Sequence, residues 1–182
     1  MKASQEIVTI RLSEMKDAAQ LMELDHLVWN RNTAPEPLHW TSREQFLLHC
    51  PPGSQLVAAC EDILCGYVGF RSPSGLASHR HVMELNIAVH PSYQRQGIGL
   101  QLIEAAKELA SGEGIAKLRL RVLSSNLAAL SLYRACGFRE EGRLVREFYV
   151  DGRYVDDIWM CLLFIKISGM LSIRPGDGRG LG

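Results

Sequence analysis

The segment Gln94-Arg95-Gln96-Gly97-Ile98-Gly99 joins a predicted strand to a predicted helix. Residues 82–89, just before it, have the apolar and β-branched composition of a strand and stop at His90-Pro91. Apolar residues recur at helical spacing over residues 102–109. Backbone N–H groups at the start of a helix form an anion site, and Gly97 and Gly99 have no Cβ to hold a phosphate away from them. The segment therefore predicts a cradle for a pyrophosphate group.

Two common phosphate-binding motifs do not fit this segment. A dinucleotide fingerprint, Gly-x-Gly-x-x-Gly, needs a third glycine at the position of Leu102. A P-loop needs Gly-Lys followed by Ser or Thr, and this triplet is missing from the segment. Taken alone, the two glycines also fit a plain strand-to-helix turn that binds nothing.

A second segment, from Asn126 to Phe138, has the pattern Asn-x-x-Ala-x-x-x-Tyr-x-x-x-Gly-Phe. It follows a predicted strand, residues 116–122, in which apolar and basic residues alternate. Asn126 and Tyr133 are seven residues apart, so they face the same side of a helix. The two segments occur in a fixed order, which makes the combination more specific than either segment alone.

Together the two segments resemble the GNAT superfamily of N-acetyltransferases, whose acetyl-CoA loop is Gln-x-x-Gly-x-Gly. The resemblance is specific over residues 82–138 and looser over residues 7–164. It implies an α/β fold with a mixed central sheet of about seven strands flanked by about four helices. It also implies direct transfer of the acetyl group from acetyl-CoA to a primary amine of a small molecule or peptide in a ternary complex. The alternative is a noncatalytic module that binds or senses an acyl-CoA.

The resemblance also implies which residues contact acetyl-CoA. They include the backbone of the strand before the loop, which would bind the pantetheine arm like an added strand. The full set is Ile87, Ala88, Val89, Gln94, Arg95, Gln96, Gly97, Ile98, Gly99, Asn126 and Tyr133. Asn126 directly precedes an apolar helical run, so it fits a helix N-cap equally well.

Two residues are candidates for catalysis. A lysine-like amine has a pKa near 10.4, so deprotonating it at pH 7 costs about 4.6 kcal/mol and requires a proton acceptor. Glu84 is the only carboxylate on the strand that leads into the loop, and it resembles the general base of several branches of the family. Its alternative role is an ion pair with a basic neighbour. Tyr133 matches the family's general acid, which protonates the departing thiolate, and its alternative role is a buried structural tyrosine.

The acceptor pocket is expected along the segment between the first two helices. Trp29, Asn30 and Trp40 lie there, and Asn86 lies on the strand before the loop. Each aromatic residue could equally belong to the core. Asp156 and Asp157 could attract a cationic amine, although a solvated pair is the interpretation that we favour.

Composition narrows the class of protein. The 182 residues fit one domain, and 20 basic and 20 acidic residues give no net charge that would favour nucleic acid. Five cysteines without a Cys-x-x-Cys pair are typical of a reducing compartment. The longest apolar run, Ile158 to Ile165, is far shorter than the ~20 residues of a membrane span. We expect a cytoplasmic protein without a metal site, a membrane contact or a nucleic-acid partner, whose partners are the amine acceptor and a second copy in a homodimer.

Local patterns place the remaining elements. Residues 1–167 are expected to form the GNAT domain, and the glycine-rich residues 168–182 a disordered tail. A helix with its polar residues facing outward is predicted from the helical spacing of Ala18, Leu21, Met22, Asp25 and Val28. Thr41 and Glu44 fit a capping box, and Asp151-Gly152 is a strong hairpin signal.

Overall fold

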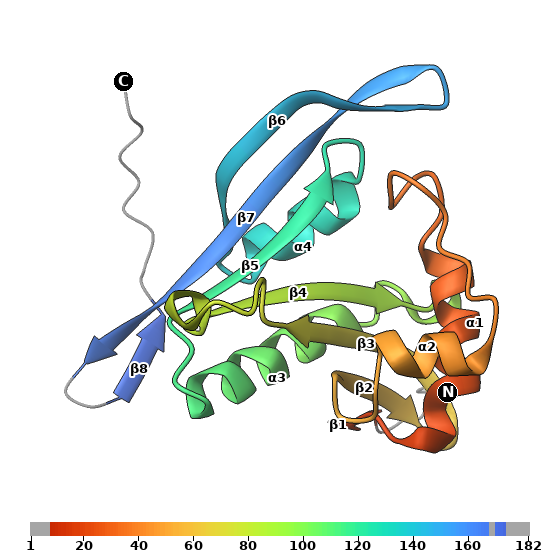
Figure 1. The fold of residues 1–182 in the computed structure, drawn as a ribbon, viewed down its shortest axis with the longest axis horizontal. Helices are drawn as coiled ribbons and strands as arrows, with labels where there is room; N and C mark the ends of the chain where they lie inside the picture. The colour runs from red at the N-terminus through yellow and green to blue at the C-terminus, as the bar shows by residue number, and fades with distance from the viewer. Residues whose placement is uncertain (1–7, 168–169, 174–182) are drawn as a thin grey trace, which may run out of the picture.

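The protein is described by a computed structural model covering residues 8–167 and 170–173, and its strands form one mixed sheet (Figure 1). The strand order is β1-β2-β3-β4-β5-β7-β6, with β8 paired to β7. The strands are β1 (Val8–Leu12), β2 (Gln55–Cys60), β3 (Ile63–Arg71), β4 (Val82–Val89), β5 (Lys117–Leu123), β6 (Arg139–Val150), β7 (Arg153–Ile167) and β8 (Met170–Ile173). The helices are α1 (Ala18–Val28), α2 (Arg43–His49), α3 (Ile98–Gly112) and α4 (Leu127–Ala135), with short 3-10 turns at Met15–Asp17, Ala77–His79 and Pro91–Tyr93.

The helices cover the two faces of the sheet in pairs. Helices α3 and α4 pack on one face, and their buried side chains join those of β4 and β5 in the larger core. Helices α1 and α2 pack on the other face, against Val57, Tyr67 and Ala88. Neighbouring side chains of β4 point to opposite faces, so Met83, Leu85 and Ile87 belong to the larger core and Ala88 to the core under α1 and α2. The predicted α/β fold of about seven strands and four helices is confirmed, with β8 added.

The two parallel strands in the middle of the sheet separate along their length. Strands β4 and β5 pair only at Val82–Lys117, Met83–Leu118 and Glu84–Arg119. Beyond these positions β4 continues to Val89 and β5 to Leu123, but the two strands no longer pair with each other. Figure 1 shows the two strands diverging toward their carboxyl ends. The result is a V-shaped opening in the sheet, with Glu84 and Arg119 at its apex.

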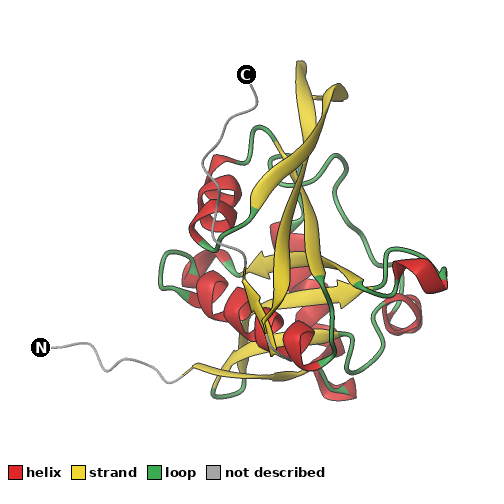
Figure 2. Ribbon diagram, turned by 90° about the vertical axis from the view of Figure 1, so that its left-hand side faces the viewer, coloured by secondary structure: helices red, strands yellow, loops and turns green. Residues whose placement is uncertain are grey.

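Strands β6 and β7 form a long hairpin that extends beyond the helices (Figure 2). Its turn is Asp151-Gly152, as predicted, and both residues have positive φ, 47° and 79°. At the tip, the Arg31 guanidinium lies 3.1 Å from the Asp151 carboxylate. The hairpin therefore reaches the segment that follows α1, on the α1–α2 side of the molecule.

Three local features differ from the predictions or add to them. The N-cap of α2 is Ser42, whose Oγ accepts from the Gln45 N–H at 3.1 Å, so the capping box predicted one residue earlier was wrong. Asp25 faces inward, because three hydrogen-bond donors surround its carboxylate. Within the predicted tail, the apolar residues 170–173 form β8, whose backbone pairs with β7. The rest of the predicted tail lies outside the described residues.

Candidate active site

The loop before α3 has the backbone geometry of an anion cradle. Gly97 is the N-cap of α3 with φ 84°, a left-handed conformation that glycine adopts without strain. Arg95 also has positive φ, 62°. The side-chain amide of Gln94 donates to the Val89 carbonyl, and that of Gln96 to the Ser92 carbonyl, both at 3.2 Å. These contacts fix the loop so that the first N–H groups of α3 are directed out of the helix end.

Gly99 also has a packing role that the sequence did not indicate. A Cβ at this position would lie 2.9 Å from Cδ2 of Leu132, a residue of α4. The missing side chain of Gly99 therefore allows α3 and α4 to approach each other closely. At Gly97, by contrast, a Cβ would have only the end of the Gln101 side chain near it, at 4.0 Å. Gly97 is needed for its backbone conformation, and Gly99 for helix packing.

The edge of β4 that faces the opening has unpaired backbone groups. The backbone groups of an antiparallel pair point alternately toward and away from the partner strand. His90 donates its N–H to Cys65 O on the β3 side, whereas His81 O accepts from Lys117 N–H on the β5 side. Counting along β4, the groups of Ala88 point to β3, and those of Ile87 and Val89 point into the opening. Of the three residues predicted to contact pantetheine, Ile87 and Val89 therefore direct backbone groups into the opening, whereas Ala88 uses its own in the pairing with β3.

Helix α4 carries the second motif on the same face of the sheet as α3. The Asn126 side chain accepts from the Ala129 N–H at 3.2 Å, so Asn126 is the N-cap of α4. The Tyr133 ring is buried, and within the described part of the chain no residue forms a hydrogen bond with its hydroxyl. Burial raises the pKa of Tyr133, so the phenol is fully protonated at neutral pH. It therefore has a proton to donate.

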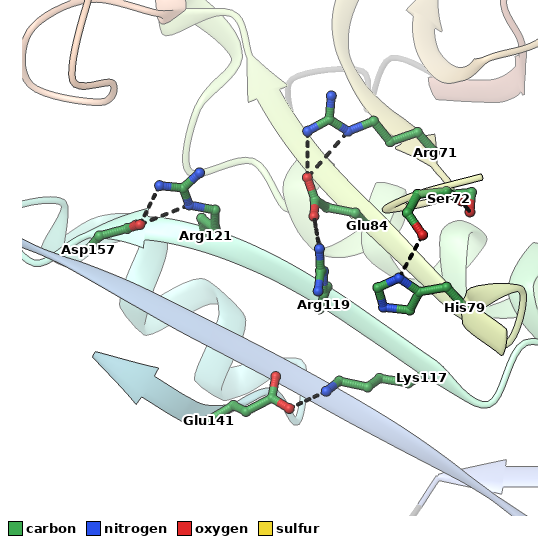
Figure 3. Close-up of polar contacts among 10 residues, drawn as sticks. Arg71, Ser72, His79, Glu84, Lys117, Arg119, Arg121, Glu141 and Asp157 are labelled. Carbon is green, nitrogen blue, oxygen red and sulfur yellow. Dashed lines mark hydrogen bonds and ion pairs between the residues drawn. The ribbon is translucent and has the colours of Figure 1, made fainter. Parts of the chain in front are cut away.

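Glu84 lies between two arginines at the apex of the opening (Figure 3). Its Oε1 accepts from Arg71 Nη2 at 2.6 Å, and its Oε2 accepts from Arg119 Nη2 at 2.8 Å and Nε at 3.0 Å. The side chain is 12% exposed. Burial raises the pKa of Glu84, but the two guanidinium hydrogen bonds together outweigh burial, and the net pKa is lowered. The ion pair given as the alternative for Glu84 is therefore present, and Glu84 is ionised at neutral pH.

A cationic strip continues from Glu84 along β5 on the same sheet face. Arg119 and Arg121 both lie over the Trp159 ring, at 4.8 and 4.9 Å from its centroid. Arg121 also forms an ion pair with Asp157, which is buried (Figure 3). Asp157 is thus not the solvated residue that we expected, because the strand pairing of β5 with β7 brings Arg121 over it.

The aromatic residues predicted for the acceptor pocket meet around Asp25. Trp29 Nε1 donates to Asp25 Oδ1 at 3.1 Å, and Trp40 Nε1 donates to Oδ2 at 2.8 Å. The hydroxyl of Tyr67, on β3, also donates to Asp25 Oδ1. Asn86 reaches this group through Tyr67, with its Nδ2 3.4 Å from the hydroxyl oxygen. The structure therefore brings together three of the four predicted acceptor residues.

Asn30 is the fourth predicted acceptor residue, and it lies in a turn instead. Its Oδ1 accepts from the Asn32 N–H at 3.0 Å, and its Nδ2 donates to the Leu27 carbonyl at 3.3 Å. The residues that the sequence did not reveal are Arg71, Arg119, Asp25 and Tyr67. The alternating basic residues of residues 116–122 were a visible signal for Arg119. Asp25 had only its helical spacing with Leu21, Met22 and Val28 as a signal, and Tyr67 had none.

Two absences concern the described residues alone. Within residues 8–167 and 170–173, no three His, Cys, Asp or Glu side chains form a group that could hold a metal ion. No helix in the described part of the chain has the length and apolar character needed to cross a membrane.

Comparison with known proteins gives the family. The model of the acetyltransferase (GNAT) family matches residues 18–138. This is more than half of the chain, so the chain belongs to the GNAT family. It is 46% identical over 70 residues to the ribosomal protein bS18-alanine N-acetyltransferase of Escherichia coli K12, covering 37% of this chain and 47% of that protein. It is 39% identical over 84 residues to the spermidine N(1)-acetyltransferase of Vibrio cholerae, covering 46% and 49%. The chain thus spans about half the length of these curated relatives.

A longer match and two solved structures extend the similarity. The L-methionine sulfoximine/L-methionine sulfone acetyltransferase of Salmonella typhimurium is 26% identical over 164 residues, which cover 85% of this chain and 94% of that protein. The crystal structure of smu.2055 from Streptococcus mutans has a TM-score of 0.78 at 29% identity, with coverage of 84% and 97%. A GNAT phosphinothricin acetyltransferase from Sinorhizobium meliloti, solved with acetyl-CoA, has a TM-score of 0.78 at 20% identity, with 94% coverage of both chains. This last likeness concerns the fold alone.

Proposed function

We propose that the protein is an acetyl-CoA-dependent N-acetyltransferase that transfers the acetyl group directly to a primary amine in a ternary complex. The observation that carries the proposal is the opening between β4 and β5. It combines a strand edge that is not paired with β5, a helix N-terminus with a left-handed glycine cap, and a buried tyrosine whose hydroxyl has no hydrogen-bond partner among the described residues. The reacting group that acetyl-CoA supplies is a thioester, which an amine can attack.

Binding of acetyl-CoA is assigned to backbone groups. The N–H groups at the start of α3 suit the negative charge of a pyrophosphate, because they lie at the positive end of the helix dipole. The backbone groups of Ile87 and the N–H of Val89, which point into the opening, suit the amides of the pantetheine arm; the Val89 carbonyl already accepts from Gln94. Arg95 adds a positive charge beside the loop. Asn126 acts here through its cap on α4, which fixes the helix that carries Tyr133.

Tyr133 is assigned the role of hydrogen-bond donor to the leaving thiolate. A thiol has a pKa near 8.5, and the pKa of Tyr133 lies above its ordinary value of 10. The phenol therefore still carries its proton when negative charge builds on the sulfur atom. It then stabilises that charge by donating a hydrogen bond, and the released thiolate takes its proton from solvent.

Glu84 is assigned the role of general base, which receives the proton of the amine through a water molecule. Its position at the apex of the opening supports this role, and its ionised state at neutral pH is what a base requires. The lowered pKa makes Glu84 a weak base, but the nitrogen atom becomes far more acidic as its bond to the acetyl carbon forms. The two arginines also keep the carboxylate in one orientation.

The charges of the sheet face favour an acceptor with an anionic group beside its amine. Arg71, Arg119 and Arg121 carry three positive charges, and Glu84 and Asp157 carry two negative ones, so this set is positive by one. Arg71 is 77% exposed and Arg121 is 45% exposed, so both can bind a further anion. An amino acid with a free carboxylate satisfies this chemistry, whereas a polyamine does not.

An assay of free-thiol release from acetyl-CoA tests the proposal with three amines. They are L-methionine sulfone, spermidine and a peptide with an N-terminal alanine, each taken from the name of a relative. We expect thiol release above the enzyme-free rate, fastest with L-methionine sulfone. A faster reaction with spermidine would contradict the amino-acid preference, and the enzyme-free rate with every amine would contradict the enzyme.

A further inference from the structure

Asp25 is a buried carboxylate without a cationic partner among the residues that the structure describes. It lies near the end of α1 and is 1% exposed. No Lys, Arg or His of the described chain lies within ion-pair distance of it, and its three donors are two indoles and a phenol. Burial raises the pKa of Asp25, against the smaller opposing effect of these donors. An apolar residue would fill the same space at lower cost, so packing alone does not account for a carboxylate here.

The three donors come from separate parts of the chain. Trp29 is the C-cap of α1, Trp40 precedes α2, and Tyr67 lies on β3. Neither the end of α1 nor residues 29–42 belong to the sheet, so their position relative to it depends on packing and on these bonds. The Asp25 carboxylate therefore fixes two half-buried indole rings against the sheet.

The bonds continue from Asp25 to the exposed face of β4. The Tyr67 oxygen accepts from Trp29 Nε1 at 2.8 Å and from Asn86 Nδ2 at 3.4 Å. Asn86 is exposed and lies two residues beyond Glu84, with its side chain on the same face of the strand. The chain of hydrogen bonds thus ends at a side chain that borders the opening.

Gly69 supplies an independent observation at this point. It is the residue of β3 opposite Asn86, and a Cβ there would overlap the side-chain oxygen of Asn86. The missing side chain of Gly69 therefore leaves room for the Asn86 side chain in its present orientation. The hydrogen bond to Tyr67 selects this orientation.

We propose that Asp25 is the positioning residue of the amine-acceptor site. Its carboxylate orients Trp29 and Trp40 directly and Asn86 through Tyr67, and this arrangement determines which amine is bound. The inference rests on the proposed function. Asp25 does not touch the acceptor, so its effect lies in acceptor binding and selectivity and leaves acetyl-CoA binding unchanged. Two aromatic rings beside a buried negative charge suit a protonated amine.

The test replaces Asp25 by Asn, which has the same size but only one oxygen atom to accept hydrogen bonds. In Asp25→Asn we expect the KM for L-methionine sulfone to rise at least tenfold, kcat to change less, and the Kd for acetyl-CoA to stay within twofold. The ranking of the three amines should change, and the near-ultraviolet circular dichroism of the indoles should weaken while the far-ultraviolet spectrum is retained. Asp62→Asn makes the same chemical change at an exposed turn and should behave as the wild type.

Two further variants keep the proposal testable if Asp25→Asn does not fold. Tyr67→Phe removes only the hydroxyl, and Asn86→Ala changes an exposed side chain, so both leave most of the core in place. Each should raise the KM for the amine without changing the Kd for acetyl-CoA. Unchanged KM values and an unchanged amine ranking in folded variants would overturn the proposal. Failure of the proposed function is seen separately, because the wild type would then release no thiol with any of the three amines.

Discussion

Glu84 and Arg119 are the last paired positions of β4 and β5, and their side chains form an ion pair where the two strands separate. The Glu84 carboxylate also binds Arg71, which is opposite it on β3. One carboxylate thus joins three neighbouring strands at the apex of the opening. From this position we expect Glu84 to have two separable effects, one on turnover and one on stability.

Replacement of Glu84 by Gln tests its role as proton acceptor. Gln keeps the shape of the side chain and removes its basicity, so turnover should fall by about 10²- to 10⁴-fold with little change in acetyl-CoA affinity. Steady-state kinetics and calorimetry measure the two quantities. Glu108→Gln, at an exposed position of α3, should keep wild-type turnover. Near wild-type turnover in Glu84→Gln would show that Glu84 is not the proton acceptor and that its role is limited to the ion pair.

The pH dependence of stability reports the ion pair independently of catalysis. The pKa of Glu84 is lowered from 4.5 in the folded protein, so its ion pairs stabilise the fold fully above the unfolded pKa. This contribution is lost as the pH falls through the lowered folded pKa. The difference in unfolding free energy between wild type and Glu84→Gln should therefore shrink below about pH 4.5. Urea unfolding at pH 7 and pH 3 measures it, and a difference that is equal at both pH values would contradict the ion-pair contribution.

A matched pair at Gly97 tests the anion cradle. Asn and Asp have similar size, and both tolerate positive φ better than most residues, so each should fold. Gly97→Asp adds a negative charge at the start of α3 and should weaken acetyl-CoA binding at least about tenfold more than Gly97→Asn, equivalent to about 1.4 kcal/mol. Calorimetry gives both affinities. Equal affinities for the two variants would exclude the N-terminus of α3 as the pyrophosphate site.

Gly99→Ala tests the packing role that the structure gives this glycine. The added methyl group would meet Leu132 of α4, so we expect a loss of about 1–3 kcal/mol in unfolding free energy. Gly112→Ala, at the other end of α3, adds a methyl group in open space and should stabilise the protein by about 0.5–1 kcal/mol. Leu132→Ala should partly restore the stability of Gly99→Ala. If Gly99→Ala and Gly112→Ala have the same unfolding free energy, the close contact between α3 and α4 does not contribute to stability.

Tyr133→Phe separates an enzyme from a module that only binds acetyl-CoA. The ring and its packing are kept, so the Kd for acetyl-CoA should be almost unchanged while turnover falls. The loss should shrink for an acyl thioester with a more acidic thiol, because that thiol leaves with less assistance. Since burial raises the pKa of Tyr133, wild-type activity should show no decline from loss of its proton up to about pH 10. An equal loss with all thioesters would indicate that Tyr133 positions acetyl-CoA instead.

The sequence predicted the parts of the molecule that depend on local pattern. The run of β4, the helical spacing after Gly97 and the Asp151-Gly152 turn each predict their element within a few residues, because period and turn chemistry are local properties. The partners of Glu84 are not local. Arg71 and Arg119 are 13 and 35 residues away, and only the register of the sheet brings them to one carboxylate.

The burial of Asp25 could not be predicted for a related reason. A polar residue in an amphipathic helix is normally exposed, and Asp25 is buried because Trp29, Trp40 and Tyr67 surround it with donors. Two of these three residues are distant in the sequence. Gly99 is similar, since its neighbour Leu132 belongs to another helix. The surroundings of Asp25 and Gly99 depend on tertiary contacts. Such contacts cannot be derived from the local pattern of a single sequence.

The central claim is that an amine receives the acetyl group of acetyl-CoA. Mass spectrometry of the acetylated amine, measured together with free thiol in the same reaction, tests it most directly. We expect one acetylated amine for each thiol released by the wild type, with both products strongly reduced in Tyr133→Phe. Binding of acetyl-CoA by calorimetry without any acetylated amine above the enzyme-free level would contradict it and identify a noncatalytic acyl-CoA-binding module.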